Sequence, residues 1–470
     1  MKLHNTMTGQ AEELQTLEPN KVKFYSCGLT VYSQPHIGNW LGYIYWDVLS
    51  RVLAADGFTV EHTQNYTDVG HLTSDDDNGE DKMEKGARKE GITAWDIAEK
   101  YIGVASREGY ELLDLKRPTH LVRATDLIDK QIEFAKALDE KGYLYEIPDE
   151  GMYFDTSKVE DYGKLARLDI AGLEGGIRVA VDGKKHITDF AVWKFSPKDQ
   201  KRDMEWESPW GTGFPGWHLE CSVIAREALG GQIDIHSGGI DHIPVHHTNE
   251  IAQTESLTGK SFANIWLHNN HIKIDGKKIS KSLGNIVTLQ DILDRGYTMG
   301  AFKLMVLSKH FATEGNFTWE ILASAQNRLN NWRNVAALRH QVNDDVESSQ
   351  ENPSLAVIGA IKEALNDNLN TPEALRLIDE VFSHLESHSS DTIDKQALVD
   401  LLGEIDGLFG LNLLETTPDI PDEAKQTILE RTRVREAKDW QKSDELRDEI
   451  EATYHITLLD KPSGVVWQYS

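Results

Sequence analysis

The sequence predicts an α/β protein with a parallel-sheet domain, an insert within that domain, and a mainly helical C-terminal half. Three observations predict this arrangement. Residues 22–69 read as strand, helix and strand, the alternation of strands and helices resumes after residue 216, and helical spacing of apolar residues dominates from residue 288 onward. A length of 470 residues also exceeds what one hydrophobic core usually serves, so we expect two to four domains.

The first βαβ unit lies near the N-terminus. VKFYSCGLTVY (22–32) is a short apolar run, WLGYIYWDVLSRVLAADG (40–57) has apolar residues three and four apart until Gly57, and FTVEHTQNYTDV (58–69) is a second strand candidate. Units of this kind build parallel sheets whose ligand sites lie at the carboxyl ends of the strands. The sequence therefore predicts a Rossmann-like, nucleotide-binding domain.

An inserted domain follows, because the pattern after residue 125 becomes mixed. A helix is predicted at 127–142 and short strands at 152–157 (MYFDTS), 177–181 (IRVAV) and 190–195 (FAVWKF). The βα alternation then resumes with a strand at 232–239 (QIDIHSGG) and a helix at 248–259. The tail ITLLDKPSGVVWQYS (456–470) breaks helical periodicity and predicts a small end cap.

Composition points to a soluble cytoplasmic protein. Hydrophobic residues make up 39% of the chain, no apolar run approaches the ~20 residues of a membrane span, and two cysteines cannot build a disulfide framework. A net charge of −28 disfavours indiscriminate binding to nucleic acid. A specific nucleic-acid partner needs a local basic surface, and 431–447 offers one; the alternative is a solvated helix face.

Two short stretches carry phosphate chemistry. PHIGN (35–39) places a histidine and a glycine at a strand-to-helix turn, where the backbone can approach a triphosphate and the helix start offers free N–H groups. KKISKSLGN (277–285) offers lysines and hydroxyls that can close over phosphates and stabilise a leaving pyrophosphate. Alone, each is compatible with an incidental turn or a solvated basic loop.

Together, and in this order around an insertion, the two stretches resemble the signatures of class I aminoacyl-tRNA synthetases. A third set of residues narrows the resemblance. Cys27, Cys221, His246 and Glu250 offer thiolate, imidazole and carboxylate ligands for zinc, although scattered residues of these types are also compatible with two buried cysteines and a surface pair.

The stretches YSCGLTVY, PHIGN, NYTD, DFAVWK, PWGTGFPGWHLECS, DIHSGGIDH, HHTNEIAQ, KKISKSLGN, DNLNTPEAL and AKDWQKSDELRDEI with its PSGVVW tail resemble cysteinyl-tRNA synthetases nearly end to end. The resemblance implies ligation of L-cysteine to tRNA(Cys) through a cysteinyl-adenylate, with ATP as substrate, Mg²⁺ beside it, and one Zn²⁺ per chain that selects the cysteine thiolate over serine. It further implies a cytoplasmic, monomeric enzyme with no membrane association.

Carried over by position, the resemblance implies four groups of residues. The zinc ligands are Cys27, Cys221, His246 and Glu250, with His242 and His247 as nearby imidazoles that could be mistaken for the ligand. The ATP site comprises His36, Gly38, Asn39, Gly238, Gly239, Asp241, Lys278, Ser280, Lys281 and Ser282. Gly28, Thr67, Trp217 and His236 surround the amino acid, and Trp440 with Asp444 contacts the anticodon, the alternative for Trp440 being a core position.

The same resemblance implies six regions. They are two halves of the catalytic domain at 1–125 and 216–287, an inserted connective domain at 126–215, a stem-contact helical region at 288–345, a helical bundle at 346–415, and a small anticodon-binding domain at 420–470.

Three positions depart from the family pattern. Asn39 replaces the usual second histidine of the first signature, an acidic insertion occupies the region around 70–80, and Phe214 stands where the family has arginine. Two other functions remain open at this point: a cysteine ligase that transfers to a small amine, and a non-catalytic zinc-binding regulatory module. The C-terminal motifs favour tRNA over the small amine, and the lysine-rich loop favours catalysis over the regulatory module.

Overall fold

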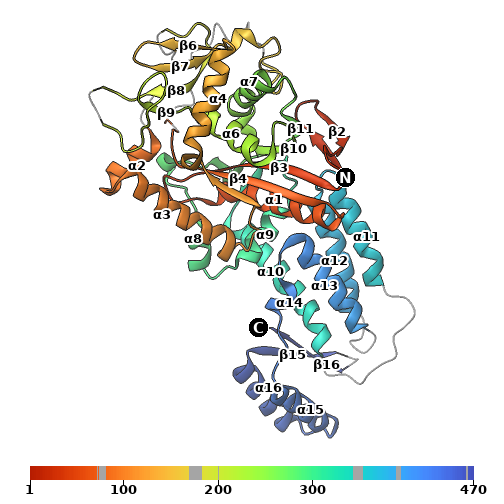
Figure 1. Cartoon of the computed structure of the whole chain (residues 1–470). Helices are drawn as coiled ribbons and strands as arrows, with labels where there is room; N and C mark the ends of the chain where they lie inside the picture. Colours follow the sequence, from red (N-terminus) through yellow and green to blue (C-terminus); the bar gives the residue numbers. More distant parts are fainter. Residues whose placement is uncertain are drawn as a thin grey trace. The chain divides into compact units, whose positions relative to one another are not determined.

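The computed structural model describes residues 1–70, 72, 81–168, 183–198, 201–341, 353–387, 393–461 and 464–469. The chain divides into two compact units (Figure 1). One comprises Met1–Asp291 with Phe311–Asn316, and the other Ile292–His310 with Phe317–Ser470.

A five-stranded parallel sheet forms the centre of the first unit. Its strand order is β11 (Ala263–Asn269), β10 (Ile233–Gly239), β3 (Lys21–Thr30), β4 (Thr59–Thr67) and β5 (His120–Arg123). The chain proceeds from β3 to β4 and β5 on one side, then returns to place β10 and β11 on the other. The strand order therefore reverses between β3 and β10, which is where ligands bind in open parallel sheets.

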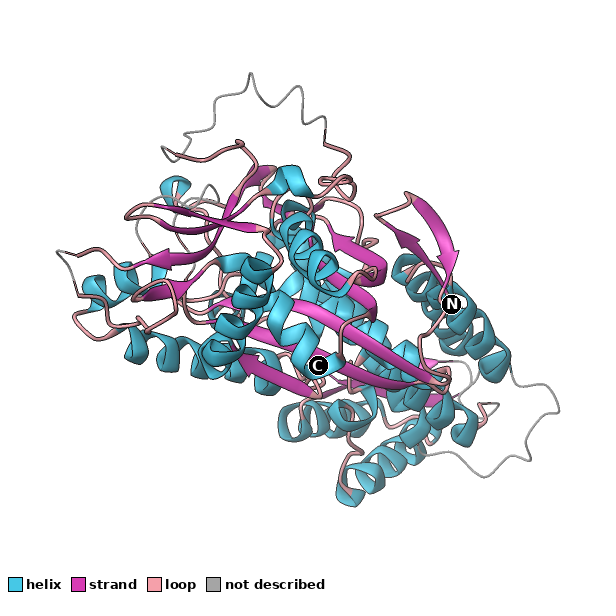
Figure 2. Cartoon of the chain, turned by 45° about the horizontal axis from the view of Figure 1, so that its top comes forward, coloured by secondary structure: helices cyan, strands magenta, loops and turns pink. Residues whose placement is uncertain are grey.

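Helices surround this sheet, whose strands appear as neighbouring magenta arrows in Figure 2. They are α1 (Ile37–Ala55), α2 (Lys82–Glu90), α3 (Ala94–Arg107), α4 (Ile128–Glu140), α6 (Trp217–Leu229) and α7 (His246–Thr258). In α1 the apolar residues Ile37, Leu41, Ile44 and Val48 recur three or four apart and are buried, as a core-facing helix requires. The helix is followed by Gly57 at φ 90°, a conformation that favours glycine.

The inserted region forms a separate antiparallel sheet. Its strands pair in the order β6 (Leu144–Ile147), β7 (Gly151–Phe154), β8 (Phe190–Phe195) and β9 (Gly213–Pro215). Smaller pieces of sheet are made by β1 (Lys2–Asn5) with β2 (Gln10–Glu13), and by β12 (Ile272–Ile274) with β13 (Lys277–Lys278) and β14 (Gly315–Phe317).

The C-terminal half is helical, as predicted. Its helices are α8 (Leu289–Asp294), α9 (Met299–Leu307), α10 (Trp319–Ala336), α11 (Pro353–Asn366), α12 (Thr371–Ser387), α13 (Lys395–Phe409), α14 (Leu413–Thr416), α15 (Asp422–Glu436) and α16 (Trp440–Tyr454). The tail forms a hairpin of β15 (Ile456–Lys461) and β16 (Gly464–Tyr469), whose Ile456 and Trp467 pack with Ile428 and Ile450 of the last two helices. This hairpin is the non-helical end that the sequence predicts.

The predicted fold class is confirmed: a parallel sheet, an antiparallel insert and a helical C-terminal region. The predicted strand at 177–181 and most of the acidic insertion, residues 71 and 73–80, lie outside the described residues. Within the described part, no helix has both the length and the apolar character needed to cross a membrane. The boundaries of the six smaller regions stay predictions.

Candidate active site and metal centre

The site begins with an irregularity in strand β3. Ser26 pairs with Gln64 and Leu29 pairs with Tyr66, so Cys27 and Gly28 together oppose the single residue Asn65. This is a β-bulge. The Gly28 N–H donates to Asn65 Oδ1 at 2.8 Å, and a Cβ at Gly28 would lie 1.6 Å from the Asn65 carbonyl oxygen. Only glycine fits there, and the bulge sets Cys27 beside the reversal point of the sheet.

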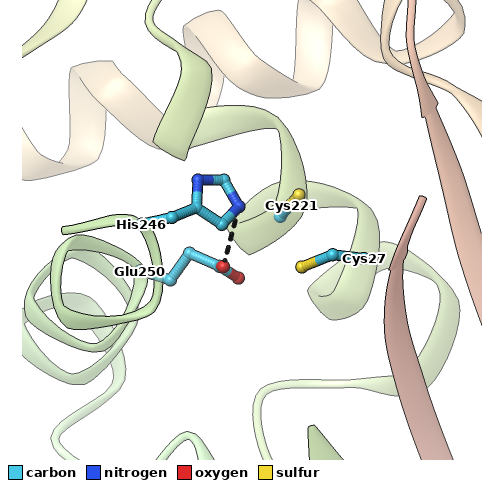
Figure 3. Close-up of side chains that lie close together, drawn as sticks. All are labelled: Cys27, Cys221, His246 and Glu250. Atoms are coloured by element: carbon cyan, nitrogen blue, oxygen red, sulfur yellow. Dashed lines mark ion pairs between the residues drawn. The ribbon is translucent and has the colours of Figure 1, made fainter. Parts of the chain in front are cut away.

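Four candidate metal ligands converge at this place (Figure 3). His246 and Glu250 extend from one face of α7, since they are four residues apart, and Cys221 comes from α6. The ligand atoms of these three residues and Cys27 all lie within 4.8 Å of one another. Elements far apart in the sequence thus bring together the set proposed from the residue types.

The donor set fits zinc. His246 Nε2 and Glu250 Oε1 are buried and lie 3.0 Å apart, an ion pair when the imidazole is protonated (Figure 3). Buried polar atoms of this kind are costly unless something binds them. The other ring nitrogen, His246 Nδ1, lies 3.0 Å from His218 Nδ1, which fixes the imidazole as outer-shell partners of zinc ligands do. Two sulfurs, one imidazole and one carboxylate are ligand types that Zn²⁺ accepts.

A second, overlapping set of four shares two of these residues. Cys27, His236, His247 and Glu250 also lie within 4.8 Å of one another. In this set both ring nitrogens of His247 already have partners, Cys27 Sγ at 3.2 Å and His268 Nε2 at 2.8 Å. The first set has two thiols where the second has one, and thiolates are preferred ligands of structural Zn²⁺, so the donor types favour the first set.

The site stabilises anionic donors. Burial alone opposes ionisation of Cys27, but Cys221 and the neighbouring imidazoles outweigh it and hold the pKa of the Cys27 thiol well below its usual value. Burial also opposes ionisation of Glu250, yet His236 and His246 lower the pKa of Glu250 to about 2. Burial and the adjacent Cys27 raise the pKa of the Cys221 thiol. Two negative donors at one buried point favour a cation there.

Sequence reasoning placed His247 near this centre but missed His218 and His268, the histidines that support it. His247 is connected through His268, whose Nδ1 lies 2.7 Å from Thr6 Oγ1, to the N-terminal segment. His218 supports His246, as described above. These residues come from α6, β11 and a turn after β1, and no spacing in the sequence links them. His236, predicted beside the amino acid, is fully buried behind Glu250 with its Nε2 2.9 Å from Glu250 Oε2, and it is not among the described residues that line the cavities.

A cavity of about 870 Å³ opens next to the metal centre. Three of the four residues predicted around the amino acid line it: Gly28, Thr67 and Trp217. The Trp217 ring centre lies 4.3 Å from that of His246, and Thr67 Oγ1 donates to Glu220 Oε1 at 2.8 Å. A small substrate held here would lie against the candidate metal ligands.

A second cavity, of about 530 Å³, adjoins the first along Cys27, Gly28 and His36. Its lining includes most of the residues predicted to contact ATP. They are His36, Gly38, Asn39, Gly238, Gly239, Asp241 and Lys278. Ser280 lines the first cavity instead. The residues predicted to contact ATP and those predicted to surround the amino acid therefore line adjoining cavities.

The two phosphate signatures meet at Gly38. His36 is the N-cap of α1, and Asn39 occupies the third helical position. A Cβ on Gly38 would lie 3.0 Å from Ile279 Cδ1 and 3.1 Å from the His36 ring, so the glycine lets the KISKS loop approach PHIGN. The Ile37 N–H also donates to the Val287 carbonyl at 2.9 Å, which ties the helix start to the chain after the loop.

The KISKS loop is organised by Asn285. Its Oδ1 accepts from the Ser280 N–H at 2.9 Å and its Nδ2 donates to the Lys278 carbonyl at 3.0 Å. The Ser280 and Ser282 hydroxyl oxygens lie 2.7 Å apart. Lys281 begins a short 3₁₀ turn, and its side chain lies outside the described residues.

Phe214, in place of the family's arginine, is a buried stacking partner. The guanidinium of Arg202 lies over its ring at 3.8 Å and donates to Asp81 Oδ2 at 2.6 Å. Asp81 in turn caps α2 by accepting from the Met83 N–H at 2.7 Å. The ring at position 214 therefore packs against a guanidinium that comes from a different segment of the chain.

In the second unit, Trp440 begins α16 and is 57% exposed, which excludes the core alternative for this residue. Arg435 lies 5.9 Å from its ring centre. Asp444 is exposed one turn further, with Oδ1 3.7 Å from Arg447. Three arginines of the predicted basic surface contact the carboxylate of Asp460: Arg431, Arg435 and Arg447. Part of the positive charge of this surface is therefore paired within the protein.

Comparison with known proteins places the chain in a family. The family model of the tRNA synthetases class I (C) catalytic domain matches residues 13–327. The chain is 44% identical over 469 residues to cysteine–tRNA ligase 1 of Burkholderia lata, covering 99% of this chain and 96% of the relative. It is 39% identical over 487 residues to the cysteine–tRNA ligase of Novosphingobium aromaticivorans, covering 100% and 97%.

Solved structures share the fold at low identity. Mycobacterium tuberculosis methionyl-tRNA synthetase in complex with methionyl-adenylate is similar with a TM-score of 0.64 at 16% identity, over 86% of this chain and 95% of that one. A LeuRS of Agrobacterium radiobacter K84 in a ternary complex with tRNA and LeuAMS gives a TM-score of 0.61 at 12% identity, over 87% of each chain.

Proposed function

The chain belongs to the cysteine–tRNA ligases, a family of class I tRNA synthetases, and we propose that it joins L-cysteine to tRNA(Cys) through a cysteinyl-adenylate made from ATP. One observation carries the proposal beyond family membership. The set Cys27, Cys221, His246 and Glu250 adjoins a cavity that is continuous with PHIGN and the KISKS loop. A thiol-selecting site thus lies beside a phosphate-binding site.

We assign zinc to Cys27, Cys221, His246 and Glu250. Cysteine and serine differ only in sulfur and oxygen, and an apolar pocket distinguishes such near-isosteres by only ~1–3 kcal/mol. Zn²⁺ bound there would supply a preference for a thiolate over a neutral hydroxyl. The protein holds the ligand geometry through His218 and His236, which contact His246 and Glu250.

The proposed first step is attack of the cysteine carboxylate on the α-phosphorus of ATP, with pyrophosphate leaving. This displacement depends on alignment and charge stabilisation more than on a general base. Gly28, Thr67 and Trp217 orient the amino acid at the first cavity. His36, Gly38, Asn39, Gly238, Gly239 and Asp241 hold the nucleotide, accompanied by Mg²⁺. Lys278, Ser280, Lys281 and Ser282 stabilise the departing pyrophosphate.

In the proposed second step the terminal ribose hydroxyl of tRNA attacks the adenylate. The near full-length match to cysteine–tRNA ligases supports a tRNA acceptor over a small amine. The exposed Trp440 and Asp444 are proposed contacts for the anticodon, because an exposed indole can stack on a base. A cytoplasmic monomer is part of the same proposal.

Two assays test the proposal in order. Cysteine-dependent exchange of pyrophosphate into ATP reports adenylate formation, and charging of tRNA(Cys) with cysteine reports transfer. We expect both. Absence of exchange would contradict the enzymatic function, and exchange without charging would indicate a ligase for another acceptor.

A further inference from the structure

Helix α2 turns a row of lysines toward the active-site cavity. Lys82, Lys85 and Lys89 all line the cavity of about 870 Å³ that also reaches Cys27. Their spacing of three and four residues places them on one face of the helix, with about 5–6 Å between successive Cβ atoms. In a chain with a net charge of −28, three cations at one end of a cavity form a local exception.

Two of these charges, those of Lys85 and Lys89, are open to a ligand, whereas Lys82 also lies over the Tyr32 ring at 5.9 Å. Lys85 and Lys89 are exposed, and within the described part of the chain neither pairs with an acidic side chain. Glu90 is the acidic residue beside them in the lining, but its carboxylate is occupied by Lys100 Nζ at 2.5 Å and by the Tyr101 hydroxyl at 2.7 Å. Among the described residues that line this end of the cavity, lysines therefore outnumber acidic side chains.

Neither small substrate accounts for the row. Most of the residues assigned to ATP line the second cavity, whose described lining includes no residue of α2. His36, Asn39, Asp241 and Ser280 also line the first cavity, but none of them belongs to α2. Cysteine is held at the metal end of the first cavity, whose volume lies in the range of pockets for much larger ligands. The α2 end is thus additional space, and its described lining includes three lysines.

Side-chain contacts anchor the start of α2. Asp81 caps α2, and its second carboxylate oxygen accepts from Arg202, which is stacked on Phe214. The Asp203 N–H also donates to Glu84 Oε1 at 2.9 Å. The lysines therefore extend from a helix that is anchored at its start.

We propose that Lys82, Lys85 and Lys89 bind the phosphodiester groups at the 3′ end of tRNA and guide the terminal ribose to the adenylate. The inference rests on the proposed function, because it names how that site receives its second substrate. A single strand entering the cavity carries one negative charge per nucleotide, and lysines spaced along one helix face can each contact a phosphate without reading sequence.

The test separates the two steps of the reaction. In the variant Lys85→Glu/Lys89→Glu, pyrophosphate exchange, which needs no tRNA, should keep its rate within about twofold, while kcat/KM for charging falls at least tenfold through a higher KM for tRNA. With Lys85→Gln/Lys89→Gln, the plot of log kcat/KM against log salt should become less steep by about 0.7 for each lost contact. Lys85→Arg/Lys89→Arg should retain charging.

Arg88→Glu is the matched control, since Arg88 lies on the same helix but is not among the described residues that line the cavity. Its charging should stay near the level of the unmodified chain. A parallel loss of exchange and charging in the double variants would assign the lysines to ATP and overturn the inference. Unchanged charging, or an equal loss in Arg88→Glu, would also overturn it. Lack of charging by the unmodified chain would instead contradict the proposed function.

Discussion

The backbone N–H of His36 donates a hydrogen bond to the side-chain oxygen of Asn39 at 2.9 Å. This contact closes the start of α1, where backbone N–H groups otherwise lack intrahelical partners. Asn39 stands where the family pattern has a second histidine. Its side chain therefore caps the helix start in addition to making the proposed contact with ATP. The departure from the family pattern thereby acquires a structural reason.

Substitution of Asn39 should separate its two roles. Asn39→Asp keeps the accepting oxygen and adds a negative charge that a helix start tolerates, so stability should be retained. The same charge should repel the phosphates and raise KM for ATP about tenfold, equivalent to 1.4 kcal/mol. Asn39→Ala should lower the free energy of unfolding by about 1 kcal/mol. Thermal unfolding and pyrophosphate exchange check both; equal KM values in Asn39→Asp and the unmodified chain would argue against phosphate contact.

Zinc binding should distinguish the two overlapping ligand sets. His246→Ala removes a proposed ligand and should abolish stoichiometric zinc in the purified protein. His247→Ala removes only a neighbour of Cys27, so zinc should still bind, with affinity reduced about 10–100-fold as for outer-shell residues. Chelator competition measures both affinities. A greater loss of zinc affinity in His247→Ala than in His246→Ala would favour the set that contains His236 and His247.

Replacement of Phe214 by the family's arginine should weaken α2. The Phe214 ring is only 3% exposed, so its stacking with Arg202 stabilises the fold by about 2 kcal/mol. Phe214→Arg would remove this stacking and bring a second guanidinium against Arg202. We expect hydrogen exchange in residues 82–90 to become at least tenfold faster. Phe214→Tyr preserves the ring and should leave exchange unchanged; equal protection in both variants would contradict the role of the stacking.

Stability at low pH should depend on Asp460. Its carboxylate accepts two hydrogen bonds from the fully buried Arg431, at 2.8 and 2.9 Å. This contact lowers the pKa of Asp460; burial of the carboxylate opposes the shift, and the charges of Arg435 and Arg447 add to it. Because the folded pKa lies below the unfolded value of about 3.9, the stabilisation is present above that value and is lost as pH falls through the folded pKa.

Asp460→Asn should therefore reduce the free energy of unfolding by about 3 kcal/mol at pH 7, as expected when a buried charge loses its partner. The difference from the unmodified chain should persist at pH 5 and shrink only below about pH 4. Urea unfolding followed by circular dichroism measures it. Asp444→Asn, at an exposed position of α16, is the control and should change stability little. A difference that is constant down to pH 3 would count against the proposed linkage.

The sequence was sufficient for the fold and for the chemistry-bearing stretches, because periodicity and local turn residues encode the βαβ units, PHIGN and KISKS. It was insufficient for the contacts that connect them. His218 meets His246, and Arg202 meets Phe214 and Asp81, only after distant segments pack together. The lysines of α2 form an ordinary charged helix in the sequence, and only the cavity reveals which face they occupy.

The bulge at Cys27 and Gly28 makes the active site depend on chain length as well as on residue type. Side chains alternate along a strand, and one extra residue reverses that alternation for everything that follows. Deletion of Gly28 would restore a regular ladder with β4. Leu29 and Thr30 would then each point to the face of the sheet opposite to the one they occupy now. A conservative substitution elsewhere in β3 alters the contacts of one side chain. This single deletion would instead reverse the orientation of every residue of β3 that follows it, including Leu29 and Thr30, which line the cavity.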